Sequence, residues 1–169
     1  TGVIEGFRRS KGADELRQFR RAQKITSQVI HRAKRALRSG ITEATLAWKL
    51  HEWVHELGGE AMAFDPIVAF GSHTSRPHHH PTQRKLRAKD IVQIDVGARY
   101  QGYCADQSAV FFQGEPTSRQ REVYEAVERA QQAAIAKIAV GVRTKKLDEA
   151  ARKILLQEGL NEYFTHSLG

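Results

Sequence analysis

Cysteine is almost absent from this sequence: its 169 residues include one, Cys104. A single cysteine excludes an internal disulfide, so the fold cannot rest on the cross-links that stabilise many small secreted domains. This composition is compatible with a reducing compartment, and we expect a cytoplasmic protein. We expect Cys104 itself to behave as a small buried hydrophobe.

Long hydrophobic runs are missing as well. No apolar stretch approaches the roughly 20 residues of a membrane-spanning helix, and the first residues do not have the pattern of a signal peptide. We therefore expect no membrane partner. The chain also lacks internal repeats, and its only low-complexity segment is the triplet His78-His79-His80.

Acidic residues are outnumbered, which gives a net charge of +8. Much of the basic excess lies early, at Arg8, Arg9, Lys11, Arg17, Arg20, Arg21, Lys24, Arg32, Lys34, Arg35 and Arg38. A basic face can bind nucleic acid, but aromatic residues do not alternate with the charges and no DNA-reading motif is present. Such a face is more often simply solvated, so we do not expect a nucleic-acid partner.

The length and the content of 40% hydrophobic and 27% charged residues suit one globular domain with a substantial core. Helical spacing of apolar residues predicts helices over about residues 14–37, 42–57, 117–138 and 144–158. Thr42 and Thr117 are suitable N-caps, and Gln120 can complete a capping box with Thr117. Residues 63–71 predict a short strand, residues 91–112 a hairpin, and residues 160–164 the start of another strand. This order predicts an α+β domain with helices against an antiparallel sheet.

The predicted hairpin carries two aspartates, Asp95 and Asp106, in otherwise apolar strands. Carboxylates in such surroundings cost free energy unless they are neutralised, and two in one place also repel each other. A divalent cation would remove both penalties, which makes the pair a candidate metal site with hydrolytic chemistry. The alternative is that both aspartates only cap turns at strand ends.

The length of the hairpin loop decides how the two carboxylates face each other. A two-residue loop of Gln101-Gly102 places Asp95 opposite Ser108 and makes Asp106 its diagonal neighbour on the same face. A loop of Tyr100-Gln101 would place the aspartates directly opposite each other. An odd-length loop would separate them onto different faces unless a bulge restored the register.

Two histidines lie in suggestive places. His78 follows Pro77 in the polar loop before the hairpin, and proline restricts the backbone there. His79 and His80 follow it directly. Three adjacent side chains cannot all point the same way, so one or two of the triplet should face solvent. His166 lies in YFTHSLG near the end of the chain. Carboxylates with imidazoles suit Mn²⁺, Co²⁺, Fe²⁺ or Zn²⁺.

The segments FDPIVAFGSHTSRPHHHPTQRKL and DIVQIDVGARYQGYCAD together resemble the pita-bread metallopeptidases, and within them the Xaa-Pro group of aminopeptidase P and prolidase. FRRSKGADELRQFRRA is similar to the start of that catalytic domain, and YFTHSLG to a shortened HxxGHGxG segment. The resemblance runs from about Phe7 to Gly169. It implies a pita-bread fold whose C-terminal part lies outside this sequence.

The resemblance also implies roles for individual residues. Asp95, in a D-x-G-A motif, corresponds to a metal ligand that chelates one ion, and Asp106, in G-Y-x-x-D, to a ligand that bridges two. His78 corresponds to a histidine that contacts the substrate and stabilises the transition state. His166 corresponds to a histidine four residues before a ligand histidine, with a supporting or substrate role. Two divalent ions, Mn²⁺ in preference to Co²⁺ or Zn²⁺, would activate the water that attacks an Xaa-Pro bond.

The sequence departs from the family pattern in two ways. After Asp106 the family usually shows D-x-T-R-T, whereas Ser108 and Ala109 stand here, so a hydroxyl is kept and the arginine is missing. The implied ligand set is two aspartates, one histidine and two glutamates, of which the last three would follow Gly169. We therefore expect residues 1–169 to be part of a catalytic domain, without a preceding N-terminal domain, and to be inactive alone.

The implied partners are a peptide with proline at its second position and a second copy of the protein in a homodimer. Two alternatives remain open at this point. One is a pita-bread module that binds proteins without catalysis, although such relatives usually lose the metal ligands. The other keeps the fold and changes the substrate, as in creatinase-like amidinohydrolysis.

Overall fold

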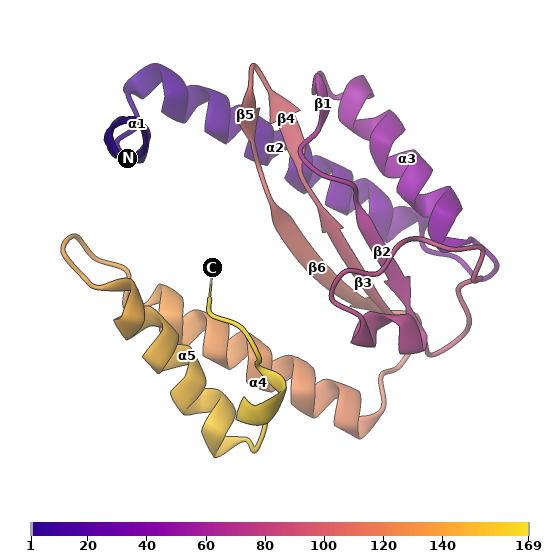
Figure 1. Ribbon diagram of the computed structural model, residues 1–169. Helices are drawn as coiled ribbons and strands as arrows, with labels where there is room; N and C mark the ends of the chain where they lie inside the picture. The colour runs from indigo at the N-terminus through magenta and orange to yellow at the C-terminus, as the bar shows by residue number, and fades with distance from the viewer. Residues whose placement is uncertain (1, 169) are drawn as a thin grey trace. The chain divides into compact units, whose positions relative to one another are not determined.

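The structure is a computed structural model that describes residues 2–168 and divides into two compact units, Thr1–Glu115 and Pro116–Gly169 (Figure 1). The helices of the first unit are α1 (Val3–Arg9), α2 (Ala13–Ala36), α3 (Glu43–Glu56) and the 3-10 helix η1 (Gly71–Ser75). Its strands are β1 (Ala61–Met62), β2 (Ile67–Phe70), β3 (Ile91–Val96), β4 (Ala98–Tyr100), β5 (Tyr103–Cys104) and β6 (Gln107–Phe112). The second unit contains α4 (Ser118–Ile135), α5 (Thr144–Gln157) and the 3-10 helix η2 (Asn161–Tyr163).

The strands form two antiparallel sheets of three strands, in the orders β1-β4-β5 and β2-β3-β6. One long hairpin runs through both sheets, because β3 continues into β4 and β5 into β6. The interruption lies at Gly97, where a Cβ atom would lie 2.0 Å from the carbonyl oxygen of Ala105. A side chain at this position would therefore push the two halves of the hairpin apart.

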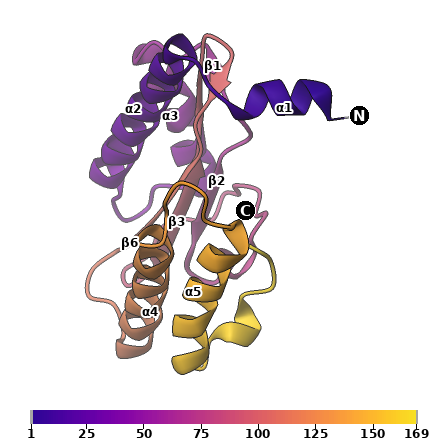
Figure 2. The same cartoon turned by 90° about the vertical axis from the view of Figure 1, so that its left-hand side faces the viewer.

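The core of the first unit lies between the strands and helices α2 and α3 (Figures 1 and 2). Along β3 the side chains of Val92, Ile94 and Val96 are fully buried, whereas those between them are half-buried. This alternation follows from the two-residue period of a strand and directs Asp95 away from the helices. Each fully buried aliphatic side chain contributes roughly 1.5–3 kcal/mol.

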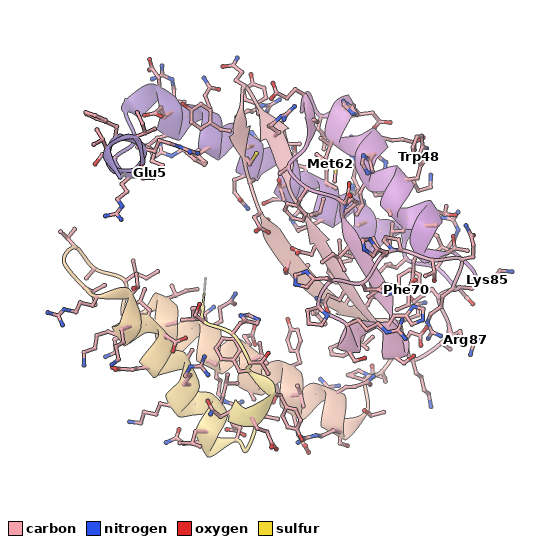
Figure 3. All side chains as sticks on the ribbon, viewed as in Figure 1. Glu5, Trp48, Met62, Phe70, Lys85 and Arg87 are labelled. Carbon is pink, nitrogen blue, oxygen red and sulfur yellow. The ribbon has the colours of Figure 1, made fainter. Side chains whose placement is uncertain are left out.

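Helix α3 shows the same division between a buried and an exposed face. Leu46, Leu50 and Val54 are fully buried, as is Phe70 at the end of β2, whereas Trp48 is 67% exposed. Figure 3 shows Trp48 on the outward side of α3. The helix begins as expected, because the Thr42 side chain accepts the N–H of Thr45.

The second unit is built on the contact between α4 and α5. Its buried side chains are Ala126, Ala130, Ala134, Ala151, Leu155 and Leu160. The predicted capping box of Thr117 and Gln120 is present at the start of α4. Val127 is 53% exposed, because the buried stripe of α4 runs through Ala126, Ala130 and Ala134 instead.

Two predictions of local structure are wrong. Residues 161–163 form the 3-10 helix η2 instead of a strand; the Leu155 carbonyl, just before the end of α5, accepts the Leu160 N–H, so the chain turns back at once. Cys104 is exposed instead of buried, because it lies beside the hairpin turn and pairs with Arg99, away from the core.

Among the helices of residues 2–168, none combines the length and the apolar character that a membrane-spanning segment needs.

Candidate metal centre

The first unit has a hollow of about 320 Å³ that contains three of the four residues singled out in the sequence. It is lined by Phe64, Asp65, Pro66, Ile67, His78, His79, His80, Asp95 and Asp106. Three separate segments contribute: the entry to β2, the loop between β2 and β3, and the hairpin. The long-range pairing of β2 with β3 brings these segments together.

The hairpin has the register that a two-residue loop predicts. Gln101 and Gly102 form the turn with positive φ angles of 46° and 80°, as a type I′ turn requires. Asp95 therefore pairs with Ser108, and the Ser108 hydroxyl donates a hydrogen bond of 2.8 Å to Asp95 Oδ1. The expected same-face arrangement of Asp95 and Asp106 is confirmed.

The electrostatics of the pair reflect this proximity. Desolvation raises the pKa of Asp106, and the charge of Asp95 and a hydrogen bond between the two carboxyl groups raise it further. Among residues 2–168, no ion pair includes either carboxylate. Two facing carboxylates in one hollow, with mutual repulsion and no cationic side chain paired to them, form a site that a divalent cation would stabilise.

The loop between β2 and β3 places the three adjacent histidines differently. His78 and His80 are exposed, and His79 is buried at 5% exposure. This agrees with the expectation that part of the triplet faces solvent. His78 follows Pro77 and lines the hollow with the two aspartates, so an imidazole is available there as a hydrogen-bond donor or acceptor.

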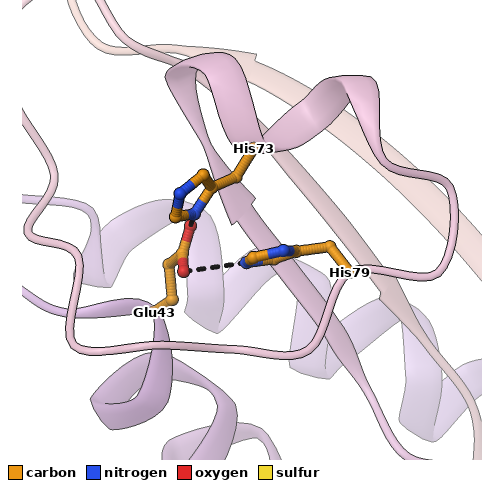
Figure 4. A group of neighbouring side chains, drawn as sticks. All are labelled: Glu43, His73 and His79. Atoms are coloured by element: carbon orange, nitrogen blue, oxygen red, sulfur yellow. Dashed lines mark hydrogen bonds and ion pairs between the residues drawn. The ribbon is translucent and has the colours of Figure 1, made fainter.

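A second cluster, made of Glu43, His73 and His79, was not predicted from the sequence (Figure 4). Glu43 is fully buried at the start of α3, with His73 Nδ1 2.8 Å from Oε1 and His79 Nε2 2.9 Å from Oε2. Burial raises the pKa of Glu43, but hydrogen bonds from His79, Thr82 and Phe70 outweigh it and lower the pKa to about 2. The carboxylate is therefore ionised throughout the physiological range.

No sequence signal distinguished this cluster. Glu43 lies 30 residues from His73 and 36 from His79, and a glutamate in the first turn of a helix is ordinary. Its burial depends on the tertiary packing of the loop onto α3. The cluster could be recognised only once the fold was known.

His166 lies in the second unit, after η2. Its ring nitrogen Nδ1 is 2.7 Å from the carbonyl oxygen of Ser167, and its own carbonyl oxygen accepts a hydrogen bond of 2.7 Å from Arg152 Nη2. The ring is also 5.1 Å from that of Phe164. The catalytic role expected for His166 stays a prediction.

Residues 17–169 match the profile of Peptidase_M24, metallopeptidase family M24. The chain belongs to this metallopeptidase family. It is also 33% identical over 167 residues to an uncharacterized peptidase of Staphylococcus aureus strain USA300, an alignment that covers 99% of this chain and 48% of the relative. The membership of this family that the sequence motifs predicted is thereby confirmed.

Solved peptidase structures share the fold. Prolidase from Pyrococcus furiosus superposes with a TM-score of 0.95 at 33% identity, over 98% of this chain and 49% of that one. X-Pro aminopeptidase from Thermotoga maritima does so with a TM-score of 0.90 at 32% identity, over 94% of this chain and 45% of that one. The predicted α+β pita-bread fold is confirmed, and the chain spans about half the length of the relatives it matches.

Proposed function

We propose that the whole protein containing this chain hydrolyses the peptide bond that precedes a proline. The observation that supports this most directly is the hollow in which Asp95, Asp106 and His78 come together from distant segments. The similarity to a prolidase and an X-Pro aminopeptidase favours proline-containing peptides as substrates. Both dipeptidase and aminopeptidase activity fit this proposal.

The three candidate residues of the hollow would have roles that fit the chemistry of their side chains. Asp95 and Asp106 would hold divalent ions, with the Ser108 hydroxyl orienting Asp95 through the hydrogen bond to Oδ1. The ions, when bound, supply a water of lowered pKa for hydrolysis. His78, exposed at the rim, would donate a hydrogen bond to the substrate carbonyl as negative charge develops on it.

The donor set suits hard to borderline metals, and we propose two Mn²⁺ ions, with Co²⁺ or Zn²⁺ as alternatives. The remaining ligands implied by the family would come from other segments of the whole protein. For His166 we propose a supporting or substrate-binding role in the whole protein, which we propose to be a homodimer. Both aspartates are kept and share a hollow, which favours hydrolysis over a purely protein-binding role.

The test is to replace Asp95 or Asp106 by asparagine in the whole protein and to assay an Xaa-Pro dipeptide with Mn²⁺. We expect each substitution to abolish turnover and to weaken Mn²⁺ binding measured by calorimetry. Without metal, Asp106→Asn should unfold at the same temperature as the wild type or slightly above it. The reason is that it removes a carboxylate whose pKa is raised by desolvation and by Asp95.

Asp14→Asn is the control, because Asp14 is an exposed aspartate on α2 that pairs with Arg17. It should retain both activity and metal binding. Wild-type turnover by Asp95→Asn or Asp106→Asn would contradict the proposed site. Hydrolysis of a creatine-type substrate in place of an Xaa-Pro bond would retain the site and change the substrate.

A further inference from the structure

One buried carboxylate holds the loop that carries His78. Oε1 of Glu43 accepts the backbone N–H of Phe70 at 2.9 Å and faces His73 Nδ1 at 2.8 Å. Oε2 faces His79 Nε2 at 2.9 Å and accepts the backbone N–H and the hydroxyl of Thr82 at 3.0 and 2.7 Å. These donors extend from Phe70 at the end of β2 to Thr82 within the loop, so a single side chain of α3 holds the loop on both sides of His78.

The carboxylate also determines which nitrogen of each histidine ring carries the proton that faces it. Because an ionised carboxylate only accepts hydrogen bonds, His73 must carry its proton on Nδ1 and His79 on Nε2. The two ring centroids are 4.5 Å apart, and Figure 4 shows both rings directed at Glu43. Within the loop, Arg76 N–H bonds to the His73 carbonyl, and His79 N–H to the Arg76 carbonyl.

His78 is joined directly to the anchored His79. Its backbone is therefore fixed by the buried ring on one side and by Pro77 on the other, while its side chain stays exposed. The same hollow contains His78, Asp95 and Asp106. Any loosening of the Glu43 contacts would change where the His78 imidazole lies relative to the two aspartates.

The three side chains could in principle bind a cation, because one donor atom of each lies within 4.8 Å of the others. Five protein donors already face the two oxygens of Glu43, however, which uses the acceptor capacity of a carboxylate. An ion would have to displace the protons of both histidines and compete with the backbone. The arrangement favours a hydrogen-bonded anchor.

We propose that Glu43 is a positioning residue of the peptidase: through His73, His79 and Thr82 it holds the loop so that His78 faces the metal-binding aspartates. The inference rests on the proposed function, because it is that function which gives His78 a substrate contact. A displacement of about 1 Å in such a contact can reduce the rate roughly 100-fold. Glu43 itself does not touch the substrate.

The first experiment replaces Glu43 by glutamine in the whole protein. The amide keeps the size of the side chain, but its NH₂ group cannot accept the histidine or threonine hydrogen bonds. We expect kcat for an Xaa-Pro dipeptide to fall roughly 10- to 100-fold, with the calorimetric Mn²⁺ affinity and stoichiometry unchanged. Glu56→Gln is the matched control, because Glu56 ends the same helix and pairs with Arg32 at the surface; it should keep the wild-type kcat.

A second pair of variants keeps Glu43 intact. His73→Leu removes one donor to the carboxylate, whereas His73→Asn offers a side-chain N–H near the position of Nδ1. We expect the leucine variant to lower kcat and the asparagine variant to recover most of it. A role in overall stability alone would lower the melting temperature of both variants without this difference in kcat.

Hydrogen exchange of the amides of residues 70–82 gives a readout that does not depend on activity. Glu43→Gln should accelerate exchange there, and most at Phe70 and Thr82, whose N–H groups bond to the carboxylate. Unchanged exchange would overturn the proposal, and so would loss of one bound Mn²⁺ in Glu43→Gln or His73→Leu. A wild type that does not cleave Xaa-Pro dipeptides would contradict the proposed function, and exchange would then decide the anchoring by Glu43 alone.

Discussion

At the scale of single residues, Gly97 shows how a backbone requirement supports a chemical site. It is the glycine of the D-x-G-A motif, two residues after Asp95, and its carbonyl oxygen accepts the N–H of Ala63 at 2.8 Å. A Cβ atom there would meet the Ala105 carbonyl oxygen at 2.0 Å and Phe64 Cε1 at 2.9 Å. Ala105 precedes Asp106, so the missing side chain lets the two aspartates approach each other.

We therefore expect Gly97→Ala to destabilise the protein by roughly 1–3 kcal/mol, the usual cost of overpacking, and to weaken Mn²⁺ binding. Urea unfolding and calorimetry measure the two effects. Gly6→Ala is the control, because nothing lies within 4 Å of a Cβ at that position in α1. A Gly97→Ala protein with wild-type stability and metal affinity would show that the close approach to Ala105 has no role in the site.

At the scale of secondary-structure elements, the loop between β2 and β3 depends on one ionised side chain of α3. The pKa of Glu43 is lowered from 4.5 to about 2 in the folded protein, mainly by hydrogen bonds that outweigh its burial. A group whose pKa is depressed by folding stabilises the protein above its unfolded pKa, and this contribution disappears as the pH falls towards the folded value. Its size is on the order of 3 kcal/mol.

The Glu43→Gln variant tests whether the ionised carboxylate contributes this stability. Above about pH 6 the variant should be less stable than the wild type, and the difference should shrink as the pH is lowered through 4.5, with about three fifths of the ionisation-dependent part lost by pH 3. Urea midpoints at several pH values measure this change. Glu125→Gln, at an exposed position of α4, should show no such convergence. A pH-independent difference would mean that Glu43 does not stabilise the fold as a carboxylate.

The elements also show what the sequence could and could not predict. The four long helices and the register of Asp95 against Ser108 follow from local signals: apolar spacing, threonine caps and the turn at Gln101-Gly102. Glu43 and its histidines could not be predicted, because their contacts join positions at least 30 residues apart without periodicity. Cys104 and residues 160–164 were predicted wrongly, because short segments at the ends of elements carry too little pattern to decide burial or conformation.

At the scale of the whole molecule, the chain spans about half of each relative, 48% of the Staphylococcus aureus peptidase and 49% of the Pyrococcus furiosus prolidase. Its first unit nevertheless contains the hollow with Asp95, Asp106 and His78. Metal affinity rises with the number of ligands and with their charge. If the whole protein supplies the further ligands that we propose, these should decide whether the site holds ions tightly enough for catalysis.

Residues 1–169 alone should therefore behave differently from the whole protein. With only Asp95 and Asp106 of the implied ligand set, the isolated segment should bind Mn²⁺ weakly and should not cleave an Xaa-Pro dipeptide. Calorimetric titration with Mn²⁺ and a dipeptide assay, performed side by side on both proteins, measure the difference, and circular dichroism shows whether the segment is folded. Micromolar Mn²⁺ affinity or metal-dependent cleavage by the segment would mean that the hollow of the first unit is sufficient, and that the missing ligands only refine a site these residues already form.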